Sequence, residues 1–191
     1  MRIARILSFA AFTGLGAVST AVAQDQGKVG ITMGYPAAIG VLWRVSDKVA
    51  IRPELSLAGG SSESTGASFE AESDNWNIST GASVLFYLHK YDQLRTYFTP
   101  RFTYSRISTT NEASGITNST TTTTGNSFGG AGLFGAEYSL GNKFAVFGEV
   151  GFGLNHTTTE GSSSFLPNTS LAKQTGNTWG SRAGIGVIFF P

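Results

Sequence analysis

Two histidines are the residues best suited to acid–base chemistry in this chain, which has no cysteine to act as a thiol nucleophile or metal ligand. A hydrolytic site needs a nucleophile, a base and an orienting group within hydrogen-bond reach of one another. His156 is followed by threonines and by Glu160, but no His-x-Ser sequence occurs. His89 lies beside Lys90 in a predicted turn, where a solvated side chain is expected. We therefore expect no catalytic residues and no enzymatic activity.

A group of acidic residues is the other candidate for ligand binding. It comprises Glu63, Glu70, Glu72 and Asp74. Such carboxylates attract cations, but they lack the regular spacing of a dedicated calcium loop. We expect a solvated acidic loop, with no metal site and no cofactor.

Seven charged residues fall on one face of the alternating segments described below. They are Arg44, Arg52, Glu54, Arg101, Glu137, Glu149 and Arg182. An enclosed ion without a partner carries a large desolvation cost, and four arginines can nearly neutralise three glutamates. If this face is enclosed, we expect a salt-bridge network that closes the interior. A gated or selective pore is the alternative.

The elements that position these charges are strands, because apolar and small residues alternate with a period of two. Most of the segments are close in length to the roughly 9–11 residues that a tilted membrane strand requires. The eight segments are Lys28–Tyr35, Ile39–Val45, Val49–Leu57, Trp76–Leu88, Thr96–Ile107, Phe128–Leu140, Phe144–Leu154 and Trp179–Phe189.

The connections between these segments alternate in length after the first hairpin, whose turn is predicted near Pro36. The short turns are Asp47-Lys48, His89–Arg95 and Gly141–Lys143, and the long, Ser- and Thr-rich connections are Ala58–Asn75, Ser108–Ser127 and Asn155–Asn177. Outer-membrane barrels have short periplasmic turns and long external loops. The threonine tract near Thr120 is expected to be mobile or to extend the barrel wall as a β-ribbon, where glycan or surface binding is conceivable.

The two faces of the segments differ in a way that indicates a membrane barrel. A soluble barrel encloses its apolar face and exposes charge. Here the apolar face is bulky and nearly uncharged, whereas the opposite face is mainly Gly, Ala, Ser and Thr with a few ions. Because an eight-stranded barrel has a narrow interior, the small-residue face suits the inside and the bulky face suits lipid. Pro53 and Pro100 fall on the outward face, where each removes a ladder donor.

Outward aromatic residues cluster at the ends of the segments, as in the interfacial girdles of outer-membrane barrels. The predicted girdle residues are Tyr35, Trp76, Tyr104, Phe128 and Trp179 at the loop ends, and Trp43, Phe86, Tyr138 and Phe189 at the turn ends.

Residues 1–23 read as a cleavable signal peptide, and 24–191 as the mature domain. Arg2 and Arg5 precede an apolar stretch, and Ala21-Val22-Ala23 offers small residues at the cleavage site. The mature chain then carries 11 basic and 12 acidic residues, which gives no basic footprint for nucleic acid. Charged residues are 13% of the chain, against about 25% for soluble domains.

The chain resembles the Gram-negative outer-membrane β-barrel domain family, which includes OmpA-type and OmpX-type eight-stranded barrels. The resemblance rests on the signal peptide and three motifs: Arg52-Pro53-Glu54-Leu55 after Ser46-Asp47-Lys48, Gly135-Ala136-Glu137-Tyr138, and the final Gly184–Phe190 strand. It implies an all-β, eight-stranded antiparallel up-and-down transmembrane barrel. The family's terminal aromatic is here followed by Pro191, and the peptidoglycan-binding domain of OmpA-type proteins is not carried over.

The resulting functional expectation is a monomeric outer-membrane protein with a structural or surface-interaction role, such as adhesion or envelope integrity. Its expected partners are outer-membrane lipid and lipopolysaccharide, the barrel-assembly machinery and periplasmic chaperones during biogenesis, and a host or surface ligand at the long loops. The alternatives are a narrow porin-like channel and, as in some eight-stranded barrels that deacylate or palmitoylate lipid A, a lipid-modifying enzyme.

Overall fold

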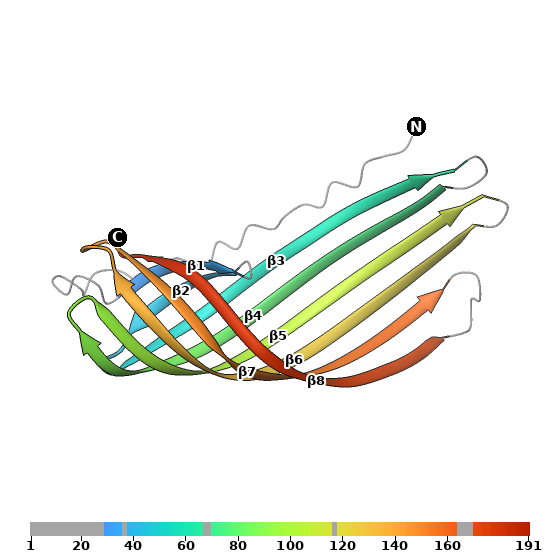
Figure 1. The fold of residues 1–191 in the computed structure, drawn as a ribbon. Helices are drawn as coiled ribbons and strands as arrows, with labels where there is room; N and C mark the ends of the chain where they lie inside the picture. Colours follow the sequence, from blue (N-terminus) through green and yellow to red (C-terminus); the bar gives the residue numbers. More distant parts are fainter. Residues whose placement is uncertain (1–28, 36–37, 67–69, 116–117, 164–169) are drawn as a thin grey trace, which may run out of the picture.

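The computed structural model describes residues 29–35, 38–66, 70–115, 118–163 and 170–191, and their strands form a closed antiparallel barrel (Figure 1). The strands are β1 (Val29–Tyr35), β2 (Ala38–Arg44), β3 (Val49–Thr65), β4 (Glu70–Tyr91), β5 (Leu94–Ser114), β6 (Ser119–Ser139), β7 (Phe144–Ser163) and β8 (Ser170–Phe189). Each strand pairs with its sequence neighbour, and β1 closes the ring against β8. The predicted eight-stranded up-and-down barrel is confirmed. The predicted signal peptide and the residue Pro36 lie outside the described residues.

The three long connections were expected to be loops, and this expectation is wrong for most of their length. Paired strands fill most of Ala58–Asn75, Ser108–Ser127 and Asn155–Asn177. Threonine and serine runs have no apolar alternation, yet β-branched threonine fits a pleated surface well. The β-ribbon alternative for the threonine tract is therefore the correct one: Thr120–Thr124 pairs with β5.

The barrel is lopsided, because its strands differ greatly in length. The β1 and β2 strands have 7 residues each, whereas β3 to β8 have 17 to 22. Figure 1 shows β3 to β8 continuing past the β1–β2 hairpin as a curved, open sheet. Beyond Leu55 on β3 and before Ile185 on β8, the described residues give these two strands a neighbour on one side only. We call this one-sided part the extension.

At the other end of the barrel, the tight turns between strands need residues with a left-handed backbone conformation. The β4–β5 turn is tighter than the predicted His89–Arg95 and needs a left-handed residue, Asp92, with φ of 49°. Gly141, with φ of 117°, supplies the same freedom in the β6–β7 turn. Around Pro53 the β2–β3 ladder is interrupted between Glu54 and Ile51, as a missing backbone donor requires.

The interior was expected to hold mainly small residues and ions, and at the turn end it does not. A buried apolar cluster fills it: Leu42, Ala50, Leu85, Tyr97, Ala145, Phe147, Ile188 and Phe190. The inward glycines are the reason that these side chains fit. A Cβ at Gly135 would lie 2.5 Å from the Tyr97 ring, and one at Gly186 would lie 2.6 Å from the Phe147 ring. Aromatic rings from neighbouring strands therefore pack against the inward glycines, and they occupy the space that the missing side chains would otherwise leave empty.

Candidate functional site

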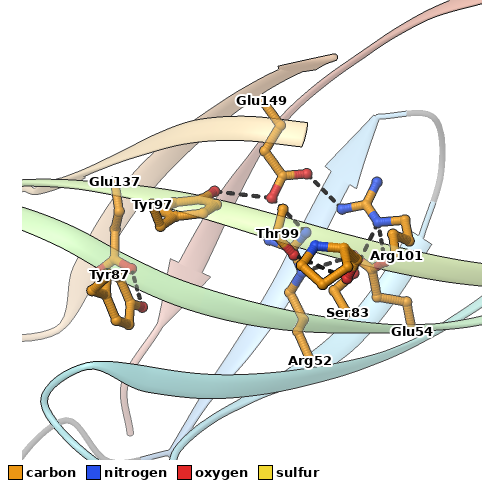
Figure 2. Close-up of polar contacts among 10 residues, drawn as sticks. Arg52, Glu54, Ser83, Tyr87, Tyr97, Thr99, Arg101, Glu137 and Glu149 are labelled. Atoms are coloured by element: carbon orange, nitrogen blue, oxygen red, sulfur yellow. Dashed lines mark hydrogen bonds and ion pairs between the residues drawn. The ribbon is translucent and has the colours of Figure 1, made fainter. Parts of the chain in front are cut away.

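An ion network crosses the lumen just above the apolar cluster (Figure 2). Glu149 on β7 accepts from three donors. Arg52 Nη2 lies 2.6 Å from its Oε1, Arg101 Nη2 lies 2.5 Å from its Oε2, and the Tyr97 hydroxyl donates to Oε1 over 2.9 Å. Glu54 completes the group, with Oε1 at 3.1 Å from Arg52 Nε and Oε2 at 3.4 Å from Arg101 Nε. We call Arg52, Glu54, Arg101 and Glu149 the central network.

The central network is charge-balanced; Arg52 and Glu149 are buried in it, and Glu54 and Arg101 are partly buried. The Arg52 side chain is fully enclosed, and its guanidinium also lies 4.8 Å from the Phe147 ring centre. A buried ion pair repays its desolvation only when geometry and additional hydrogen bonds are good. Here Ser83 accepts from Arg101 Nε over 2.9 Å, and Tyr97 supplies a further donor. The arrangement therefore cross-links β3, β5 and β7 through the lumen.

A second pair lies at the turn end. Arg44 is ion-paired with Glu137, which also accepts from the Tyr87 hydroxyl over 3.0 Å. The Arg44 guanidinium lies 4.6 Å from the Phe190 ring centre. Phe190, the penultimate residue, thus points into the lumen, while Phe189 points outward and packs against Phe144.

Six of the seven predicted interior charges fall into these two groups, and Arg182 does not. Arg182 is exposed on the inner side of β8 in the extension, where no carboxylate of the described chain pairs with it. With the Asn155 amide turned so that its oxygen accepts, Arg182 Nη2 donates to it over 2.8 Å.

The hydroxyl partners Ser83, Tyr87 and Tyr97 were missed by sequence reasoning. The signal was present for Tyr97, because it alternates in step with Arg101.

The nine predicted girdle residues all lie on the outer face. Their exposure ranges from 77% for Trp179 and 76% for Tyr35 to 42% for Phe86, with Tyr104 and Phe189 half-buried against neighbouring rings. The Tyr104 and Phe128 ring centres are 4.9 Å apart. Large apolar side chains are also exposed on the outer face between the two rows, among them Ile31, Phe152 and Val187.

The other candidate residues assemble no site within the described chain. His156 Nδ1 lies 2.7 Å from Asn177 Oδ1 on the outer face, and His89 stacks on Tyr91. The acidic residues of β3 and β4 are spread along an exposed ladder in which Glu63 is opposite Glu72. Among described residues, no group of three or more His, Asp or Glu side chains is placed to hold a metal ion. No helix in the described residues is long and apolar enough to cross a membrane.

Similarity to known structures agrees with this architecture. A major outer membrane protein from Thermus thermophilus matches 84% of this chain and 97% of its own, with a TM-score of 0.56 at 11% identity. The fold is that of an outer-membrane β-barrel. CarO2 and CarO of Acinetobacter baumannii also match, at TM-scores of 0.45 and 0.44 and identities of 13% and 14%. They cover 85% and 87% of this chain and 97% and 100% of their own. No family model and no curated protein matches the sequence.

Proposed function

We propose that the chain is an integral outer-membrane barrel of the small OmpA/OmpX type, with a structural or surface-interaction role and a closed lumen. The observation that carries this proposal is the outward band of large apolar side chains between two aromatic rows. Ile51, Phe102 and Phe152, for example, are 37%, 56% and 67% exposed. Exposed apolar surface of this extent is costly in water and favourable against acyl chains.

The closed lumen is supported by two successive layers. The central network blocks the middle of the barrel, and the apolar cluster fills the turn end below it. An eight-stranded barrel has just enough interior for side chains. The surface-interaction role is supported by the outer part of the extension, where Ser- and Thr-rich strands continue beyond the girdle residues Trp76 and Trp179. The proposed role contains no catalytic step, because the side chain that His156 contacts is an amide, Asn177, and not a hydroxyl nucleophile.

The membrane location is tested by fractionation and by heat-modifiable migration on gels. We expect the protein in the outer-membrane fraction, resistant to extraction without detergent, with faster migration of the unheated sample. We also expect brominated phospholipid to quench Trp43 and Trp76, which point outward. Recovery in a detergent-free periplasmic fraction, with these tryptophans shielded from aqueous quenchers, would refute the proposal.

A further inference from the structure

The two outermost strands of the extension have free backbone edges. The β2 strand pairs with β3 only as far as Leu55, and β1 pairs with β8 only as far as Ile185. Beyond these positions, residues 56–65 of β3 have only β4 beside them among the described strands, and residues 170–184 of β8 have only β7. A free edge of this kind is a template for pairing with another strand.

Hydrogen bonds at the turn end show which backbone groups the free edges present. The Lys48 carbonyl accepts from the Tyr87 amide, and the Lys143 carbonyl accepts from the Phe190 amide. Opposite residues of an antiparallel pair alternate between bonded and non-bonded. Because both registers are continuous, the even-numbered residues bond to β4 along 49–65 of β3 and to β7 along 174–189 of β8. The odd-numbered residues direct their N–H and C=O groups to the free edges.

Part of each free edge lies at the level of the apolar band. Gly59 of β3 is opposite the girdle residue Trp76, and Trp179 is the girdle residue of β8. Leu57 and Ser181 are odd-numbered residues on the membrane side of these positions, and their backbone groups point sideways along the wall. Water cannot satisfy such groups in hydrocarbon, so the edges favour a partner strand.

The two edges of one molecule are poorly placed to satisfy each other. Both β1 and β2 lie between β3 and β8, so direct pairing above the hairpin would close the sheet with six strands in place of eight. The interior of an eight-stranded barrel is only just wide enough for its side chains. A six-stranded closure would crowd the inward Arg182 and Asn155. Figure 1 shows the extension as an open sheet.

A second copy of the chain offers a matching edge. In two copies with the same membrane orientation, β3 runs toward the loop end and β8 runs toward the turn end, so β3 of one copy is antiparallel to β8 of the other. Pairing β3 with β3 would be parallel, and it would place the outer face of one sheet beside the inner face of the other. A two-fold axis along the membrane normal forms both β3–β8 contacts at once, so the association ends at two copies.

The charges of the two edges are complementary. Residues 170–184 of β8 contain no acid and two bases, Lys173 and Arg182, of which Lys173 lies 2.9 Å from the exposed Glu160 of β7. Like charges on neighbouring strands are destabilising and opposite charges are favourable, so β3 beside β8 is preferred to β3 beside β3. Residues 56–65 of β3 and 70–80 of β4 contain no base and four acids: Glu63, Glu70, Glu72 and Asp74.

We propose that two copies of the chain associate in the outer membrane through these edges, with β3 of each copy paired to β8 of the other. The pairing continues each sheet into its neighbour and converts the free N–H and C=O groups into ladder hydrogen bonds. It replaces the monomer expected from the sequence. The inference rests on the membrane location proposed above and is independent of the surface role.

The test is cross-linking between introduced cysteines, since the chain has none of its own. Ser61→Cys on β3 and Thr175→Cys on β8 are exposed positions beyond the aromatic rows. Two full-length copies with different tags, one for each variant, are co-expressed in the outer membrane of a Gram-negative host and treated with a short bismaleimide. We expect a product of twice the chain mass that carries both tags, and none from either variant alone. The control pairs Ser61→Cys with Glu112→Cys, an exposed position on the central strand β5, and should give no product.

A proline on the free edge tests the role of the backbone. The Ser181 N–H is directed to the free edge of β8. Proline is tolerated on an edge strand, but it removes a donor where a further strand pairs. We therefore expect Ser181→Pro in the Thr175→Cys copy to keep heat-modifiable migration and to lower the cross-linking yield about tenfold. Ser181→Ala, which keeps the N–H, should retain the full yield.

The proposal is overturned if the mixed variants give no product with both tags, or if either variant alone gives as much product. Combining Ser61→Cys and Thr175→Cys in one copy tests closure within a molecule, and a cross-linked product of single-chain mass would also overturn the proposal. The mixed-variant result stands even if Ser181→Pro does not fold. Heat-modifiable migration in the same membranes reports the membrane location separately, so the two proposals can fail independently.

Discussion

At the scale of single residues, Glu149 is the side chain on which the interior depends most. It accepts from Arg52, Tyr97 and Arg101, and its side chain is 1% exposed. Glu54 is the only other carboxylate within ion-pair distance of these two arginines among the described residues. Removing the charge of Glu149 would leave the buried Arg52 with a single, weaker partner.

We therefore expect Glu149→Gln to lower the free energy of unfolding by about 3–5 kcal/mol, the usual cost of breaking a buried ion pair. The measurement is denaturant unfolding in lipid vesicles, followed by tryptophan fluorescence. Glu160→Gln is the matched control, because Glu160 is an exposed carboxylate 2.9 Å from Lys173. Solvent screens such an exposed pair, so its loss is expected to change the free energy of unfolding much less. Equal effects of the two substitutions would show that the central network adds no stability.

At the scale of elements, the β5–β6 ribbon extends the barrel wall, and β4 and β7 pair with it on either side. It continues the barrel wall from the Tyr104–Phe128 pair to the Ala113–Ser119 pair. Among its described residues, the outer half contains threonine pairs such as Thr110–Thr122 and no large apolar side chain. An isolated hairpin is marginally stable in water, so this half depends on its pairing with β4, β7 and the barrel, and we expect the barrel to depend less on it.

We expect that replacing residues 110–122 with a two-residue Asn-Gly turn preserves heat-modifiable migration and the unfolding midpoint. The same variant should lose binding to host cells or matrix if the ribbon carries the surface interaction. The control replaces Thr120 to Thr124 with serine, which keeps the ribbon length and the hydroxyls. Full surface binding by the shortened variant would place the interaction elsewhere, and loss of the heat-modifiable form would show that the ribbon supports the barrel.

At the scale of the whole molecule, the proposed closed lumen rests on two adjoining layers, which meet where Arg52 faces the Phe147 ring and Tyr97 donates to Glu149. The central network consists of ion pairs, which can exchange partners. The apolar cluster consists of side chains that pack tightly against the inward glycines. Loss of one arginine therefore opens only the first layer. A continuous water path would also require removal of rings such as Phe147 and Phe190.

We accordingly expect no steady conductance from the wild-type protein in planar bilayers at neutral pH, and none from Arg101→Ala. Combining Arg101→Ala with Phe147→Ala and Phe190→Ala should give measurable conductance, because both layers are then thinned. Steady conductance of the wild type that changes in Arg101→Ala would instead support the narrow channel.

The sequence by itself determined the strand identity of the alternating segments, their two faces and the outward position of the predicted girdle residues, because a period of two places alternate side chains on opposite sides of any strand. It also predicted which charges share the inward face. Only the tertiary structure decided the strand stagger, and with it the pairing of Glu149 with Arg52 and Arg101 and the isolation of Arg182. Polar ribbons such as Thr120–Thr124 have no hydrophobic alternation, so their strand character depends on the neighbours they pair with. The one-sided extension likewise depends on comparing the lengths of β1 and β2 with those of β3 and β8, a relation that no single segment contains.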